Sequence, residues 1–234
     1  MKLGIMQPYF FPYIGYFQLM NVVDEFVVYD NIEFTKKGWI NRNRILVNGH
    51  DLFITIPLRK DSDYLDLRDR YLAESWSFER VKMLNRVKES YRKAPKFEVV
   101  YPLVEKCICF EDDNLFNFIL YSLNQVKEYL EIRTPFIVSS TIPIDHALKA
   151  DKKVTAICKA RNADTYVNPI GGIQLYIKDE FKNEGIELNF LKANDFEYKQ
   201  FNNEFIPWLS IIDVMMFNSK EEIKEFLHSF YTLV

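Results

Sequence analysis

The chain has 234 residues, of which 48% are hydrophobic, and this is enough apolar material for the core of one large α/β domain over residues 1–234. Its 30 basic and 33 acidic side chains leave a formal charge of -3, which excludes a basic surface for nucleic acid or an anionic membrane. Three cysteines without a zinc-ligand spacing favour a reducing, cytoplasmic setting, and we expect all three to be inert core thiols. We expect neither a signal peptide nor a transmembrane segment.

The first predicted element is a buried strand over residues 1–7. A loop rich in Pro and aromatic residues follows it, and a helix is expected to begin near Tyr16. A second strand over residues 25–29 ends in Asp30. Because ligands collect outside the carboxyl ends of parallel strands, we expect Gln7 and Asp30 to lie at one edge of a sheet.

Residues 33–44 form a predicted loop that mixes basic side chains with Asn and one Trp, and residues 45–56 follow as a hairpin with an Asn48-Gly49 turn. Arginine in this loop would hold a phosphate or carboxylate, Asn would bind hydroxyl groups, and Trp would stack on a base or sugar. Such a run of charge is also typical of a solvated hairpin surface. The candidate ligand-binding residues of this segment are Trp39, Asn41, Arg42, Asn43 and Arg44.

The middle third is predicted to be a helical layer over about residues 75–131 that covers the sheet. Ser77 is expected to cap a helix reaching Lys93, and a second helix over residues 97–110 is expected to kink or break at Pro102. Asp112 or Asp113 should cap the third helix.

Strands and helices alternate in the last part of the chain. Predicted strands cover residues 134–138, 165–167 and 186–191. Asp151 is expected to cap one helix, and a second is predicted from Leu175 to Asn183. Two more are predicted over residues 209–217 and 220–230, and Ser219 should cap the last of them. The whole pattern predicts an α/β fold with a Rossmann-like, mostly parallel sheet and one antiparallel hairpin.

Several polar residues follow directly on predicted strands, among them Ser139 and Asn168. Gly171-Gly172 is expected to lead into a helix whose backbone N–H groups would face an anion, although a plain tight turn fits the same pair. Asp30 is a candidate general base or magnesium ligand, as is Glu33, while a strand-end Asp that only caps a loop is the commoner case. His146 is a candidate acid or base near physiological pH.

Several motifs of the chain are distinctive: Gln-Pro-Tyr-Phe-Phe-Pro-Tyr-Ile-Gly-Tyr-Phe at 7–17, Asp30, Trp-Ile-Asn-Arg-Asn-Arg at 39–44, Tyr-Val-Asn-Pro-Ile-Gly-Gly at 166–172, Leu175-Tyr176 and the motif at 205–213. Through these motifs the chain resembles the WbqC-like protein family. Such proteins occur in gene clusters for bacterial O-antigen and other surface polysaccharides, so the resemblance implies a role in making or decorating an activated sugar. It also implies the site-lining positions Gln7, Asp30, Asn41, Arg42, Asn43, Asn168, Gly172 and Asp213.

A more distant likeness is to the nucleotidylyltransferase and pantothenate-synthetase type of Rossmann-like fold. In those proteins a His-x-Gly-His signature after the first strand cradles ATP phosphates. Here Tyr13-Ile-Gly-Tyr16 stands in its place, keeping the glycine and lacking both histidines. Ser139-Ser140-Thr141 is similar to a later phosphate-binding segment of that superfamily, without the basic residue that follows there. These losses leave adenylyl transfer in doubt.

The sequence thus supports an expectation of a transferase or ligase-like enzyme that moves an acyl or aminoacyl group onto a nucleotide-activated amino sugar. The cofactor would be ATP or the nucleotide sugar itself, with Mg²⁺, and the partner a small molecule rather than nucleic acid. Asp30 and His146 would be catalytic. The ligand would contact Gln7, Tyr9, Trp39, Asn41, Arg42, Asn43, Arg44, Ser139, Asn168, Gly171 and Gly172. The alternative is a non-catalytic protein of the same pathway that binds a sugar nucleotide or a partner enzyme.

Overall fold

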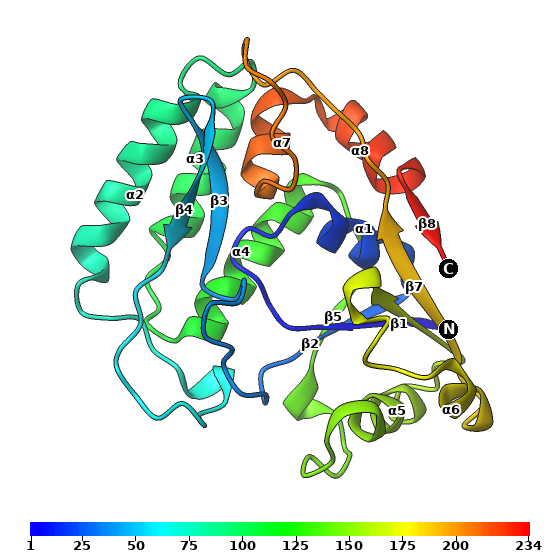
Figure 1. Ribbon diagram of the computed structural model, residues 1–234. Coiled ribbons are helices and arrows are strands. Elements are labelled where there is room, and N and C mark those ends of the chain that lie inside the picture. Colours follow the sequence, from blue (N-terminus) through cyan, green and yellow to red (C-terminus); the bar gives the residue numbers. More distant parts are fainter.

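The computed structural model describes residues 1–234 and is built around a six-stranded sheet in the order β5-β2-β1-β6-β7-β8 (Figure 1). Five strands are parallel, and the last pairs antiparallel with β7. The strands are β1 (Lys2–Met6), β2 (Glu25–Val28), β5 (Phe136–Val138), β6 (Thr165–Pro169), β7 (Glu187–Ala193) and β8 (Tyr231–Leu233). The predicted α/β class with a mostly parallel sheet is confirmed, and β8 is a strand that the sequence pattern did not indicate.

The strand order reverses between β1 and β6. From β1 the chain proceeds to β2 and then β5 on one side, whereas from β6 it proceeds to β7 and β8 on the other. Leu3 pairs with Tyr166 and Gly4 with Val167, so the two strands end together. In a doubly wound sheet, a crevice opens outside the carboxyl ends of the strands at this reversal, where the connecting loops diverge to opposite sides.

Helices cover both faces of the sheet. They are α1 (Ile14–Val22), α2 (Trp76–Tyr91), α3 (Phe97–Ile108), α4 (Leu115–Tyr129), α5 (Ala150–Ala160), α6 (Lys178–Asn183), α7 (Ile211–Phe217) and α8 (Lys220–Ser229). Side chains of successive strand residues alternate between faces, so Val28 belongs to the large core on the side of α1 and α4, while Val27 belongs to the smaller core on the side of α5 and α6. Figure 1 shows α5 and α6 across the sheet from α1 and α4.

The predicted hairpin is present as β3 (Arg42–Val47) and β4 (His50–Thr55), paired antiparallel. Its Asn48-Gly49 turn has positive φ at both residues, +50° and +80°, as a type I′ turn requires. In Figure 1 the hairpin lies beside α2 and α3, away from the carboxyl edge of β6. The expected loop over 33–44 is shorter than predicted, because Arg42, Asn43 and Arg44 already belong to β3.

Several helix predictions need correction. Helix α2 begins one residue before Ser77, whose hydroxyl donates to the Glu74 carbonyl instead of capping the helix. Asn114, not Asp112 or Asp113, caps α4 by accepting from the Asn117 N–H at 3.1 Å. Helix α3 continues through Pro102, so the expected break there is wrong, and Asp151 lies inside the first turn of α5 instead of capping it. The capping box of Ser219 and Glu222 at α8 is confirmed.

The three cysteines differ in their surroundings. Cys107 and Cys158 are buried as expected, but Cys109 is exposed at the end of α3, so the prediction of three core thiols is wrong for that residue. None of the helices has both the length and the apolar composition that crossing a membrane demands.

Candidate functional site

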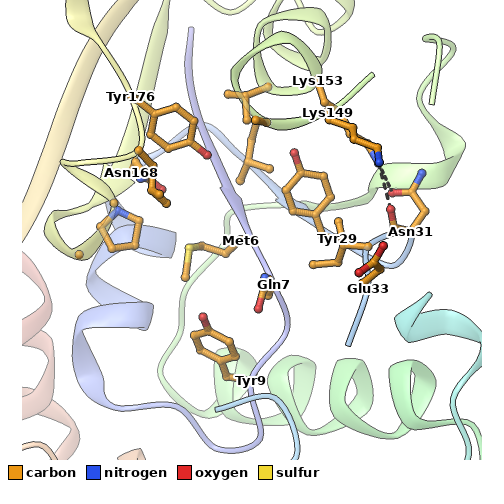
Figure 2. Close-up of a pocket in the computed structure, with 18 of the residues that line it drawn as sticks. Met6, Gln7, Tyr9, Tyr29, Asn31, Glu33, Lys149, Lys153, Asn168 and Tyr176 are labelled. Atoms are coloured by element: carbon orange, nitrogen blue, oxygen red, sulfur yellow. Dashed lines mark hydrogen bonds between the residues drawn. The ribbon is translucent and has the colours of Figure 1, made fainter. Parts of the chain in front are cut away.

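A cavity of about 760 Å³ opens at the carboxyl ends of β1, β2 and β6, where the strand order reverses (Figure 2). Pockets for small molecules fall in the range of about 300–1,000 Å³. The cavity is lined by the loop after β1, the residues after β2, the start of α5 with the segment before it, and the loop after β6. The location follows from topology, since each of these segments leaves the sheet at the same edge.

Gln7 and Tyr9, two of the predicted ligand-binding residues, line the cavity from the loop after β1. Tyr9 lies 5.7 Å from Tyr16, measured between ring centroids, and the Tyr16 hydroxyl donates to the Gln7 carbonyl at 3.0 Å. Burial raises the pKa of Tyr9 and raises that of Tyr16 well above its usual value, so both hydroxyls stay protonated. Tyr13, Tyr29 and Tyr176 also line the cavity, which gives the site five tyrosines.

Side chains from two distant segments donate hydrogen bonds to the loop after β1. Phe11 adopts φ of +42°, a region that is unfavourable for a bulky side chain. The Asn43 amide donates to the carbonyl groups of Phe10 and Phe11 at 3.2 and 2.8 Å, and the Ser210 hydroxyl donates to Phe11 O at 2.8 Å. Asn43 is therefore a support for the loop and has no contact with the cavity, although the sequence suggested a hydroxyl-binding role.

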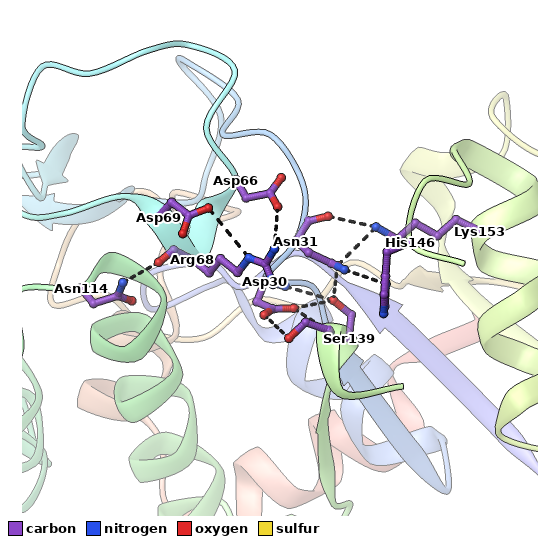
Figure 3. A network of polar contacts seen from close by, with 10 residues as sticks. Asp30, Asn31, Asp66, Arg68, Asp69, Asn114, Ser139, His146 and Lys153 are labelled. Atoms are coloured by element: carbon purple, nitrogen blue, oxygen red, sulfur yellow. Dashed lines mark hydrogen bonds and ion pairs between the residues drawn. The ribbon is translucent and has the colours of Figure 1, made fainter. Parts of the chain in front are cut away.

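Asp30 is buried, and its two carboxylate oxygens accept hydrogen bonds from the two serines that directly follow β5 (Figure 3). Its Oδ1 accepts from the Ser140 backbone N–H at 2.9 Å, and its Oδ2 accepts from the Ser140 hydroxyl at 2.5 Å. Ser139 Oγ lies 2.7 Å from Asp30 Oδ1 and 2.6 Å from Asn31 Oδ1, so its single proton is shared between them. Neither Asp30 nor Ser139 lines the cavity. Both are predicted site residues, and the structure places them behind the residues that line the cavity.

Asn31 connects this buried carboxylate to the cavity. Its Oδ1 accepts from Ser139 and from the Lys153 ammonium group, which directs its amide nitrogen to His146 Nδ1 at 2.9 Å. In this orientation Nδ1 of neutral His146 is an acceptor, and the proton of the ring is on Nε2. His146, the second predicted catalytic residue, lines the cavity, and its tautomer makes Nε2–H a donor.

Lys153 is the one buried lysine of the chain, with 7% of its surface exposed. Its Nζ donates to the Asn31 backbone carbonyl at 2.9 Å and to Asn31 Oδ1 at 3.3 Å. Burial lowers the pKa of Lys153, an effect that Asp66 and Asp30 oppose and Arg68 reinforces. The sequence did not single out Lys153, because nothing local distinguishes it from the exposed Lys152 beside it.

Asn168 and Gly172 form the β6 side of the cavity. Asn168 is buried, and its Oδ1 accepts from the Tyr166 hydroxyl at 3.1 Å. A Cβ on Gly172 would lie 2.0 Å from Asn168 Nδ2, so glycine permits this close approach, whereas Gly171 has open space around it. The helix expected from Leu175 begins only at Lys178, so the Gly pair belongs to a 3₁₀ turn (Ile170–Gly172) and not to a helix N-terminus.

The other predicted ligand-binding residues lie on the hairpin or in the loop that leads into it, and not at the cavity. Trp39 stacks on Phe53 with ring centroids 6.0 Å apart, and Arg42 Cζ lies 4.7 Å from the centroid of that Phe53 ring. Arg44 pairs with Asp51 at 3.1 Å. The Asn41 amide donates to the Ile56 carbonyl at 2.8 Å. These contacts hold the hairpin, and none of Trp39, Asn41, Arg42 or Arg44 lines the cavity.

Asp213, implied by the family resemblance, is fully buried in α7. It accepts hydrogen bonds from Tyr91, Tyr198 and Gln200, each at 2.7 Å. Burial raises its pKa, and the three donors act in the opposite direction. Asp213 is therefore part of the core and not of the cavity wall.

A magnesium ion would find few protein ligands here. Glu33 and Asp66 are the carboxylates that line the cavity, and no group of three or more His, Cys, Asp or Glu side chains is arranged to hold a metal. Mg²⁺ usually takes one or two carboxylates and completes its shell with substrate phosphates and water. The donor set fits only that kind of shared coordination.

Fold and cavity together define a doubly wound α/β protein with a small-molecule-sized site at its topological switch point. The chain belongs to the WbqC-like protein family, whose model matches residues 7–225. A relative from Mycobacterium tuberculosis, described as "Uncharacterized protein Rv1507c", is 26% identical over 230 residues, which is 97% of each chain. No solved structure matches the chain.

Proposed function

We propose that the protein is a transferase or ligase-like enzyme that binds a nucleotide-activated amino sugar in this cavity and transfers an acyl or aminoacyl group to it. The observation that carries the proposal is the combination of tyrosine walls with His146, Lys149 and Lys153 in one cavity at the switch point. Aromatic rings suit a sugar or a base, and cationic groups suit phosphates. Membership of the WbqC-like family supports a place in surface-polysaccharide biosynthesis.

The proposed reaction is attack of the sugar amine on the acyl carbonyl. A carbon–nitrogen bond forms, the bond from the carbonyl carbon to its leaving group breaks, the amine loses a proton and the leaving group gains one. Glu33, which lines the cavity, accepts the proton from the amine and delivers it to the leaving group, while His146 donates a hydrogen bond from Nε2–H to the carbonyl oxygen as negative charge develops there.

The test is calorimetry with ATP and a panel of nucleotide sugars, followed by mass spectrometry of mixtures that contain an acyl or aminoacyl donor. We expect heat from at least one nucleotide sugar and a product heavier by the transferred group. His146→Gln should abolish the product, while His50→Gln, an exposed residue at the hairpin turn, serves as the matched control. Folded protein that binds none of the nucleotide sugars contradicts the proposal.

A second candidate is a non-catalytic protein that binds a sugar nucleotide. The observation in its favour is that Asp30, one of two residues expected to move protons, is sealed behind Asn31 and two serines. This candidate predicts binding that survives Asp30→Asn and His146→Gln, with no product under any condition. Product formation that is lost with His146→Gln in folded protein rules it out.

A further inference from the structure

The ammonium group of Lys153 lacks the counterion that a buried charge normally has. The residue makes two hydrogen bonds, both to oxygens of Asn31, and forms no ion pair with a carboxylate. Buried charges in proteins are usually paired or bind a metal, because removal from water is costly. An ammonium group has three donors, so one remains after the two contacts with Asn31.

Lys153 borders the cavity although only 7% of its surface is exposed. Lys153 lines the cavity together with Lys149 and Ala150 from the start of α5. No side chain caps the N-terminus of α5, which leaves its first N–H groups free for an acceptor. Nζ lies 5.5 Å from the centroid of the Tyr29 ring, which covers another side of the group. Asp66 and Asp30 favour the charged form of Lys153, and Arg68 disfavours it. His146, Lys149, Glu33 and Tyr29 line the same cavity.

We propose that Lys153 is the cation that receives the phosphate group of the ligand, so that the anionic end of the ligand lies against the first turn of α5 and its sugar end against the tyrosines after β1. This assignment rests on the proposed function and adds to it the orientation of the ligand and a binding residue that the sequence did not indicate. The phosphate is thereby assigned to α5, whereas the sequence suggested the hairpin arginines and the Gly171-Gly172 pair.

An anionic partner would also remove the cost of charging Lys153. Burial lowers its pKa in the free protein, and a phosphate beside it would raise that pKa again. Binding should therefore weaken as the pH rises through the pKa of Lys153 in the free protein. Above that pH, the site must take up a proton before it can hold the anion.

The test is titration calorimetry with inorganic phosphate at a series of pH values between about 8 and 10, over which phosphate remains a dianion. We expect millimolar binding by the unsubstituted protein. Lys153→Gln should weaken binding by about fivefold or more, because a charge-assisted hydrogen bond is worth on the order of 1 kcal/mol or more. Lys152→Gln, which removes the same charge from the exposed neighbour, should leave binding unchanged. Lys153→Arg should keep binding and lose the pH dependence, because arginine does not titrate there.

A second measurement avoids substitutions altogether. The reaction of each lysine with trinitrobenzenesulfonate is followed by mass spectrometry with and without phosphate, and phosphate should slow modification of Lys153 but not of Lys152. The inference is overturned if phosphate does not bind, if both Gln variants lose binding equally, or if Lys153 is not protected. Phosphate binding at Lys153 without turnover of any nucleotide sugar would instead reject the enzymatic function and leave this site in place.

Discussion

The backbone carbonyl of Asn31 accepts a hydrogen bond from the ammonium group of Lys153 at 2.9 Å. This contact joins the loop after β2 to the first turn of α5, although Asn31 and Lys153 are 122 positions apart in the sequence. The same asparagine contacts His146 through its amide nitrogen. One residue thus positions both polar groups that the proposed function requires, and its own position is fixed by Ser139, which directly follows β5.

Asn31→Asp should weaken phosphate binding without unfolding the protein. The new carboxylate would lie at the Oδ1 position, 3.3 Å from Lys153 Nζ, and would give the lysine an internal counterion. A competing ion pair of this kind reduces affinity by about tenfold for each 1.4 kcal/mol it contributes. Phosphate titration and a thermal melt check this result. Equal affinity in the two proteins would show that the anion does not contact Lys153.

Gly172→Ala should damage the site, whereas Gly171→Ala should not. The added methyl group at 172 would lie 2.0 Å from Asn168 Nδ2, and the buried Asn168 can move only by giving up its hydrogen bond from Tyr166. Overpacking of this kind costs about 1–3 kcal/mol. The methyl group at 171 meets no atom within 4 Å. Thermal melts and nucleotide-sugar titrations of the two variants provide the comparison, and equal behaviour of both would contradict the packing described for Asn168.

Asp213→Asn should destabilise the fold by about 2 kcal/mol, because the amide would place a donor against one of the three donors that surround this buried position. The pKa of Asp213 is raised in the folded protein. As the pH falls from 7 towards 4, the folded state takes up this proton before the unfolded state does, so the residue stabilises the fold increasingly.

The unfolding free energies of the original protein and of Asp213→Asn should therefore differ more near pH 4.5 than at pH 7. Denaturant titrations at the two pH values measure this difference. A difference that shrinks on acidification would mean that the three hydrogen-bond donors outweigh burial, so that the pKa of Asp213 is lowered.

Iodoacetamide should modify one thiol of the native protein. Burial raises the pKa of Cys107 to about 12 and that of Cys158 to about 12, so neither forms an appreciable amount of thiolate near pH 8. Cys109 is exposed. Mass spectrometry should show a single adduct at Cys109 in buffer and three adducts in denaturant. Rapid modification of Cys158 in buffer would indicate that the core beneath α5 opens.

Local signals predicted much of the fold. The Asn48-Gly49 hairpin turn, the Ser219 capping box and the apolar strands depend on residues near one another in sequence, and these elements lie where expected. Helix boundaries were less predictable when several cap residues competed, as at Asp112, Asp113 and Asn114. The short β8 has no strand pattern in its sequence and forms by pairing with the edge of β7.

The candidate site was predictable mainly where strand ends determine it. Gln7 reaches the cavity because it follows β1, and Asn168 reaches it because it lies near the carboxyl end of β6. The position of Asp30 was also predicted, but the serines that seal it come from more than 100 residues away. Lys153 could not be found in this way, since its burial depends on how α5 crosses the end of β2.

The most direct test of the account is a crystal structure of the protein soaked with a nucleotide sugar that binds in calorimetry. We predict electron density for the ligand between the carboxyl ends of β1 and β6, with a phosphate group at hydrogen-bond distance from Lys153 and the sugar beside Tyr9. Density at the hairpin instead, against Trp39, Arg42 and Arg44, would contradict it.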